Sequence, residues 1–244
     1  KVTFTFHKKN NKSQIVLVLI IVGLLSFSIS APIFSNINYA NYPAPNAHTE
    51  YTTVCFDTSH NDIMIDPFSS VFQINSEYNY ATFFCWTQRV GLYPSIEETL
   101  ESCLDNDVIV FIDPDVAFAA EELDSLQSYV EKGGKILVLD SVDNEKSTAN
   151  DLLSSFDSEF NIIEVTNDTN TSLSVNVGEA GSIIIKNSTT IGKIDYGTGM
   201  VVVAVDSNNF SDSFMGDPFT EPNQAQREVY DIEFYIFEEV FFKN

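Results

Sequence analysis

The sequence predicts an α/β fold with a largely parallel sheet, helices on both faces, a β-rich C-terminal half and one preceding transmembrane helix. Three observations predict it. Residues Asp107–Ile112 (DVIVFI) form an almost continuous apolar run, which is typical of a strand buried on both faces of a parallel sheet. A helical pattern and a second apolar run, Lys135–Leu139, follow directly. Near the N-terminus, residues 15–34 contain no charged side chain.

The uncharged run from Ile15 to Phe34 has the length of a membrane span. At about 1.5 Å per residue, a helix of this length covers roughly 30 Å, the thickness of a hydrocarbon core. All lysines near this run precede it, so residues 1–14 are expected in the cytoplasm and residues 35–244 outside. A cleavable signal peptide remains the alternative; we expect an uncleaved signal anchor because the apolar run is long.

The charge of the remainder is strongly negative. All 35 acidic residues but only 8 of the 12 basic residues follow residue 34, a net charge of −27 for that part of a chain whose total is −23. Such a surface repels phosphate backbones and anionic lipid headgroups, which argues against DNA, RNA and peripheral membrane binding. Residues 35–50 are polar, contain Pro43 and Pro45, and predict a linker. Residues 51–244 predict one extracytoplasmic domain.

The first half of this domain alternates β-rich and helical stretches. A strand is expected at Tyr51–Asp57, a helix around Ile63–Ile74, a further apolar run at Ala81–Trp86, and helical spacing at Ser95–Leu104.

The clearest helix lies between the two apolar strands. Leu123, Leu126 and Val130 form its apolar face, and Gly133-Gly134 ends it. Because a strand follows at once, the order indicates a right-handed crossover onto a parallel sheet, with Leu126 in the core.

The second half of the domain has a different composition and a different pattern of elements. A short helix is expected at Asn150–Phe156, and residues 160–205 are rich in Val, Ile, Thr and Asn, which favours antiparallel or mixed strands. The expected strands are Asn161–Val165, Ser172–Val177, Ser182–Ile185 and Met200–Val205, and an amphipathic helix is expected at Gln226–Phe242.

Cysteines and sequons predict two kinds of covalent modification. Three cysteines without a CxxC spacing do not predict a metal site. If one disulfide forms, Cys55–Cys85 is the expected pair; the alternative is three buried thiols. Four asparagines stand in glycosylation sequons: Asn167, Asn170, Asn187 and Asn209.

Four stretches in order resemble glutamine-amidotransferase-like domains. They are Val54–His60, Asp107–Pro114, Glu121–Gly134 with the strand after it, and Gly197–Phe210. The resemblance covers most of residues 51–242 and implies a flavodoxin-like, amidotransferase-like sheet. Its relatives include membrane proteins of domain-of-unknown-function family 4350, subunits of gliding-motility and intraflagellar transport assemblies, and the 48-kDa-type subunit of oligosaccharyltransferase. In those assemblies such a domain resembles a binding or scaffolding module.

The residues for amidotransferase chemistry are absent in their usual order. A nucleophilic Cys should follow the central strand, with a His and a Glu further along. Here the turn reads Asp113-Pro114-Asp115, and no histidine follows His60. The sequence also contains no G-x-S-x-G elbow and no phosphate-binding glycine loop. No catalytic residue, cofactor or metal is therefore predicted.

Polar residues at strand ends are the candidate ligand site. Asp57, Ser59 and His60 end the first strand, and Asp113 and Asp206 end two others. Carboxyl ends of parallel strands share one edge, so these residues are expected to line a crevice for a sugar or a cation. The alternative is structural: Asp57 and Ser59 cap the next turn, with His60 as a hydrogen-bonded neighbour.

Together these observations favour a non-catalytic, membrane-anchored binding or scaffold subunit of a larger membrane complex. Its expected partners are other subunits and a glycan, not nucleic acid. A hydrolase that uses Asp57 and His60 is one alternative, and a structural component of the cell envelope is the other.

Overall fold

A computed structural model describes residues 15–24, 26, 51–67, 78–167, 170–179 and 181–242. The chain divides into two units, Lys1–Glu50 and Tyr51–Asn244. In the first unit, residues 15–24 are helical. Within the described parts of the chain, no helix combines the length and the apolar character needed to cross a membrane. The whole of the predicted linker, residues 35–50, and residues 25 and 27–34 of the predicted span lie outside the described residues.

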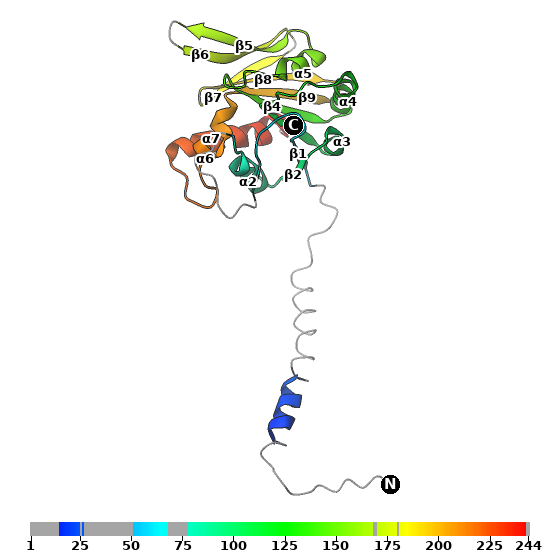
Figure 1. Cartoon of the computed structure of the whole chain (residues 1–244), viewed down its shortest axis with the longest axis vertical. Helices are drawn as coiled ribbons and strands as arrows, with labels where there is room; N and C mark the ends of the chain where they lie inside the picture. Colours follow the sequence, from blue (N-terminus) through cyan, green and yellow to red (C-terminus); the bar gives the residue numbers. More distant parts are fainter. Residues whose placement is uncertain are drawn as a thin grey trace. The chain divides into compact units, whose positions relative to one another are not determined.

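The second unit is an α/β domain built on a seven-stranded sheet of order β2-β1-β3-β4-β9-β8-β7 (Figure 1). The first five strands in this order are parallel, and β8 and β7 continue the sheet antiparallel. A separate antiparallel hairpin, β5–β6, accompanies it. The predicted α/β class, the largely parallel sheet and the β-rich second half are confirmed.

The elements follow one another along the chain in a simple order. The strands are β1 (Thr53–Asp57), β2 (Tyr93–Glu97), β3 (Val108–Ile112), β4 (Lys135–Asp140), β5 (Phe160–Asn167), β6 (Asn170–Val177), β7 (Ser182–Lys186), β8 (Thr189–Tyr196) and β9 (Gly199–Val205). The helices are α2 (Ala81–Arg89), α3 (Leu100–Cys103), α4 (Ala120–Glu131), α5 (Ala149–Phe156), η1 (Ser207–Phe210), α6 (Asp212–Met215), α7 (Gln224–Phe234) and the π-helical η2 (Tyr235–Phe241).

Both faces of the sheet are covered, which explains why β3 is apolar throughout. Ile109 and Phe111 belong to a core shared with α3, α4, α5 and the β5–β6 hairpin. Val108, Val110 and Ile112 belong to a second core shared with α2, α7 and η2. Side chains alternate across a strand, so a strand with helices on both sides must be apolar at every position. Leu126 of α4 is fully buried in the first core, as predicted.

Two predicted helices are corrected. Of the expected helix Ile63–Ile74, the described part to Pro67 is not helical, and Met64 instead forms a β-bridge with Asn79; residues 68–74 lie outside the described residues. Of Ser95–Leu104, the first three residues belong to β2 and only Leu100–Cys103 forms a regular helix. Pairing with β1 supplies the backbone hydrogen bonds of β2, and this non-local pairing outweighs the local helical spacing.

The apolar run Ala81–Trp86 is part of helix α2. Strand β8 is not among the predicted strands. The predicted β-rich region contains Gly192 in the middle of β8. A Cβ on Gly192 would lie 2.4 Å from Val175 Cγ1, so glycine is needed where the hairpin packs against the sheet.

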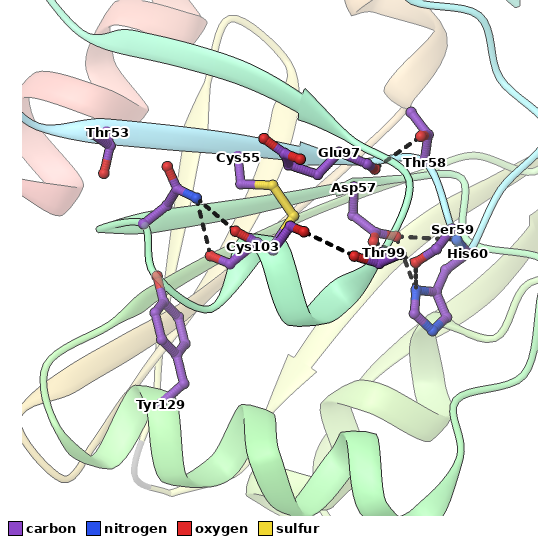
Figure 2. Close-up of a disulfide and its surroundings, with 12 residues drawn as sticks. Thr53, Cys55, Asp57, Thr58, Ser59, His60, Glu97, Thr99, Cys103 and Tyr129 are labelled. Atoms are coloured by element: carbon purple, nitrogen blue, oxygen red, sulfur yellow. Dashed lines mark hydrogen bonds and ion pairs between the residues drawn. A yellow bond between two sulfur atoms is a disulfide. The ribbon is translucent and has the colours of Figure 1, made fainter.

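The predicted Cys55–Cys85 disulfide is wrong: Cys55 is bonded to Cys103, with a Cα–Cα distance of 5.3 Å (Figure 2). The direction of the side chains in β1 explains the outcome. Val54 and Phe56 face the core that contains α2, whereas Cys55 faces the opposite core with α3. Cys85 lies on α2 and is free. The sheet therefore separates it from Cys55.

Candidate functional site

Four aspartates lie where parallel strands end. Asp57 and Asp140 are the last residues of β1 and β4, and Asp113 and Asp206 directly follow β3 and β9. Because these strands are parallel, all four aspartates lie along the carboxyl edge of the sheet, as predicted for three of them. Asp140 was missed, although its position immediately after the apolar run of β4 is the signal that could have identified it.

His60 is held by carboxylates on both sides. Its Nδ1 lies 2.9 Å from Asp57 Oδ2, and its Nε2 lies 3.5 Å from Glu122 Oε2. Ser59 Oγ donates to Asp57 Oδ1 at 2.6 Å and lies 3.0 Å from His60 Nδ1. The imidazole stacks on the Phe118 ring with a centroid distance of 4.1 Å. Figure 2 shows Asp57, Ser59 and His60 turned toward one another at the end of β1.

This arrangement decides the chemistry of His60. Burial lowers the pKa of His60, but the hydrogen bonds and negative charges of Asp57 and Glu122 outweigh burial, so the pKa stands above its ordinary value. Each ring nitrogen faces a carboxylate oxygen, which favours the doubly protonated imidazole. His60 thus bridges the end of β1 and the first turn of α4.

Asp113 joins three elements at the end of β3. It has a positive φ of 45°, a left-handed conformation that a non-glycine residue adopts at some cost. Its carboxylate accepts hydrogen bonds from Tyr80 Oη at 2.9 Å and Ser207 Oγ at 2.7 Å. Burial raises the pKa of Asp113, although these hydrogen bonds oppose the rise. The turn after β3 therefore presents a carboxyl group whose two oxygens already accept hydrogen bonds.

The aspartates at the ends of β4 and β9, Asp140 and Asp206, are buried and half-buried. Asp140 accepts from Asn144 Nδ2 at 2.9 Å and from Ser147 Oγ at 2.6 Å, and burial raises its pKa to about 6. Asp206 has a φ of 69° and precedes η1, and burial raises its pKa as well. The Asp140 carboxyl group thus organises the loop that follows β4.

The predicted single crevice proves to be two separate hollows. Ser59 lines one, of about 570 Å³, with acidic side chains of the loop after β2 and of α4. Asp113 lines the other, of about 400 Å³. Neither hollow is lined by Asp57, His60 or Asp206.

The Asp113 hollow has the more varied lining. Besides Asp113 it is lined by Asp62, Ile63, Tyr78, Asp115, Ser141, Asp143, Asn144, Glu145, Lys146 and Asn208. Asn208 Nδ2 donates to Asp143 Oδ2 at 2.6 Å across the loops after β9 and β4. Five carboxylates stand against one lysine, so the hollow offers mainly hydrogen-bond acceptors beside an aromatic ring.

The described residues include two of the four sequon asparagines with their side chains, Asn187 and Asn209. Asn187 is exposed in the turn between β7 and β8, and its Nδ2 donates to Glu228 O at 2.9 Å. Asn209 is half-buried in η1. Asn167 and Asn170 end β5 and begin β6, and their side chains are outside the description. Within the described ranges, no three His, Cys, Asp or Glu side chains converge as metal ligands.

Comparisons with known proteins identify no family. No protein-family model matches the chain, and no curated protein matches it. Among solved structures, the N-terminal domain of mmIFT52 is similar with a TM-score of 0.49 and 13% identity, covering 75% of this chain and 96% of that one. The cytoplasmic protein STM3548 from Salmonella typhimurium has a TM-score of 0.44 and 13% identity, covering 75% and 98%. The exo-beta-1,4-mannosidase Op5Man5 from Opitutaceae bacterium strain TAV5 has a TM-score of 0.44 and 12% identity, covering 80% and 37%. Likenesses at this level support no statement about function.

Proposed function

We propose that the chain is a membrane-anchored protein whose acidic domain lies outside the membrane and binds a partner protein or glycan without catalysing a reaction. One observation carries the non-catalytic part: both ring nitrogens of His60 face carboxylates. A general base must accept a proton from a substrate within hydrogen-bonding reach. Carboxylates at both nitrogens of His60 favour the protonated imidazole, which does not accept a proton. The Asp57–Ser59–His60 cluster therefore supports a structural role.

The finer fold assignment is also a proposal. The order β2-β1-β3-β4-β9 corresponds to the order 2-1-3-4-5 of flavodoxin-like sheets, with β9 in the place of the fifth strand. The resemblance of Val54–His60 and Gly197–Phe210 to amidotransferase-like domains agrees with this order. In such a domain Asp113 stands at the nucleophile position, which supports a binding module that lacks amidotransferase chemistry.

The extracytoplasmic placement rests on two independent features. The uncharged run Ile15–Phe34 follows the basic N-terminal residues, which favours translocation of everything after it. The buried disulfide Cys55–Cys103 favours an oxidising compartment, because cytosolic thiols are generally kept reduced. A strongly acidic surface beyond the span leaves protein subunits and neutral glycans as the partners that suit the domain.

The Asp113 hollow is the ligand site that we assign to this function. Its carboxylates and the amide oxygens of Asn144 and Asn208 can accept hydrogen bonds from hydroxyl groups, and Tyr78 offers a ring on which a sugar can stack. It lies at the carboxyl edge, where open α/β sheets bind their ligands.

Binding and turnover can be tested on the same preparation of the full chain in detergent. We expect retention of a glycan from an array, weakened at least tenfold by Asn144→Ala, with Asn161→Ala as a control outside the hollow. We expect no amidase, esterase or glycosidase activity. Turnover that disappears in both Asp57→Asn and His60→Gln would overturn the proposal and establish the hydrolase.

Topology needs a separate experiment. Protease added to intact cells should remove residues 51–244 while a tag at the N-terminus stays protected. Full protection of the domain would exclude the proposed orientation.

A further inference from the structure

Glu233 is a fully buried carboxyl group between two helices. It lies on α7, and Thr87 of α2 is buried opposite it. Glu233 Oε1 and Thr87 Oγ1 are 3.3 Å apart, and Glu233 Oε2 has no hydrogen-bond partner among the described residues. Burying an ionised carboxylate without a paired charge is costly, whereas a neutral carboxyl group with a hydrogen bond is tolerated. The site therefore accommodates a protonated Glu233 far better than an ionised one.

The hydroxyl group of Thr87 shows the same preference through its single proton. Thr87 Oγ1 lies 2.9 Å from Phe83 O, a carbonyl oxygen that can only accept a hydrogen bond. If Thr87 donates its proton to Phe83, its oxygen can accept from Glu233 only when Glu233 carries a proton of its own. Both contacts are then hydrogen bonds. Once Glu233 ionises, the one hydroxyl proton can serve only one of the two acceptors.

The charged groups near Glu233 do not compensate for its ionisation. The titratable groups of this region come from three helices and one loop: Cys85 and Arg89 of α2, Asp212 of α6, Asp217 of the loop after it, and Tyr230 of α7. None of the salt bridges in the described part of the chain includes Glu233. Arg89 instead donates to Pro218 O and lies over the Trp86 ring, 4.1 Å from its centroid. Burial raises the pKa of Glu233 well above its ordinary value, and the hydrogen bond with Thr87 only partly opposes the rise.

The helical segment that carries Glu233 can leave the sheet without breaking it. Helix α7 continues directly into the π-helical η2, a rare backbone form that is frequent at functional sites. Neither element contributes a strand, so their detachment breaks no hydrogen bond of the sheet. Apolar packing holds them: Ile236, Phe237 and Phe241 are buried in the same core as Phe83 of α2. Because such packing supplies most of the stability of a helix, a charge placed inside the contact acts against the whole segment.

We propose that Glu233 is a proton-dependent latch: when protonated it holds α7 and η2 against α2, and when it loses the proton it releases them while the sheet stays folded. A carboxyl group that ionises more easily in the released state favours release as the pH rises. The docked state is therefore most favoured below the ordinary pKa of 4.5. Above it, the equilibrium constant for release grows about tenfold per pH unit until the raised pKa of docked Glu233 is reached. The latch requires neither the membrane anchor nor the Asp113 hollow.

Hydrogen exchange of the full chain in detergent tests the latch. Comparing the wild type with Glu233→Gln at each pH cancels the intrinsic pH dependence of amide exchange, and glutamine keeps the shape of the side chain but cannot ionise. We expect the exchange rate of the α7 and η2 amides, relative to Glu233→Gln, to rise at least about tenfold between pH 5 and 7. Asp231→Asn removes an exposed carboxylate from the same helix and should keep the wild-type pH dependence. Equal pH dependence in the wild type and Glu233→Gln would overturn the proposal.

Thr87 tests the contact from the other helix. Thr87→Val keeps the size of the side chain but removes the hydroxyl group, so protonated Glu233 loses its partner. The α7 and η2 amides should then exchange at least about fivefold faster at pH 5, because a buried polar group is left without a hydrogen bond. Thr87→Ser retains the hydroxyl group and should restore slow exchange. Equal exchange rates in Thr87→Val and Thr87→Ser would refute the role of this hydrogen bond.

Strand β3 and the single tryptophan distinguish a latch from a general loss of stability. The β3 amides lie in the middle of the sheet and should show no pH-dependent difference between the wild type and Glu233→Gln if only α7 and η2 leave. Equal acceleration of β3 and α7 would mean that ionisation unfolds the whole domain, and would overturn the latch. Trp86 is the only tryptophan, and its ring stacks on Tyr230 of α7 at a centroid distance of 4.2 Å. Its fluorescence should therefore change with rising pH in the wild type. An equal change in Glu233→Gln would assign the transition to another group, such as Asp212, and refute the latch.

Discussion

Loss of the Cys55–Cys103 disulfide should destabilise the domain by about 4 kcal/mol. The two cysteines are 48 residues apart in the chain, and closing a loop of this length removes roughly that much conformational free energy from the unfolded state. The loop contains α2 and β2, so the crosslink joins β1 directly to α3. Both cysteines are fully buried, so a reductant should reach the bond only on unfolding.

Urea unfolding of the full chain, followed by tryptophan fluorescence, measures this contribution. The free energy of unfolding should fall on adding a reductant to the wild type and in Cys103→Ala without reductant. Cys85→Ala is the matched control, because Cys85 is free and half-buried on α2. Reductant should have no further effect on Cys103→Ala.

Two results would refute the reasoning. A change of less than about 1 kcal/mol on reduction would mean that the disulfide is absent or that the reduced chain retains the same constraint. A reductant effect that is lost in Cys85→Ala, and kept in Cys103→Ala, would restore the pairing expected from the sequence.

Three further predictions follow from buried groups. Leu126→Ala should cost about 2–5 kcal/mol by leaving a cavity in the core, whereas Ile163→Ala on the exposed face of the hairpin should stay within about 0.5 kcal/mol; urea unfolding of both variants checks this. Burial raises the pKa of Asp140 to about 6, so the stabilising effect of its protonated form is present below about pH 4 and is lost as the pH rises through 6. Asp140→Asn should flatten the dependence of the free energy of unfolding on pH over that window. An unchanged slope would contradict the raised pKa of Asp140. Glu233 is fully buried, only one of its carboxyl oxygens has a partner, Thr87, and its pKa is raised well above the ordinary value by burial. Its stabilising protonated form is lost as the pH rises through that raised pKa, so Glu233→Gln should gain stability over the wild type at alkaline pH, measured by thermal unfolding between pH 7 and 10.

Local sequence determined the elements whose signals are contained within a short stretch. The apolar run of β3, the helix α4 with its Gly133-Gly134 end, and the strand after it were predictable because hydrophobic periodicity and helix stop signals are local. The strand-end aspartates were partly predictable for the same reason: Asp57, Asp113 and Asp206 follow apolar runs directly. Asp140 has the same signal.

Tertiary structure alone decided what depends on which face or edge meets which. Cys55 bonds to Cys103 because alternate residues of β1 face opposite cores, and no spacing in the sequence reveals which helix covers which face. His60 is held on both sides because Glu122, 62 residues away in the chain, lies 3.5 Å from its second nitrogen. The open edge at β7 exists because β8 pairs with β9 on one side and β7 on the other. Each outcome rests on contacts between distant segments, whose free energy of packing and hydrogen bonding outweighs the local preferences that a sequence displays.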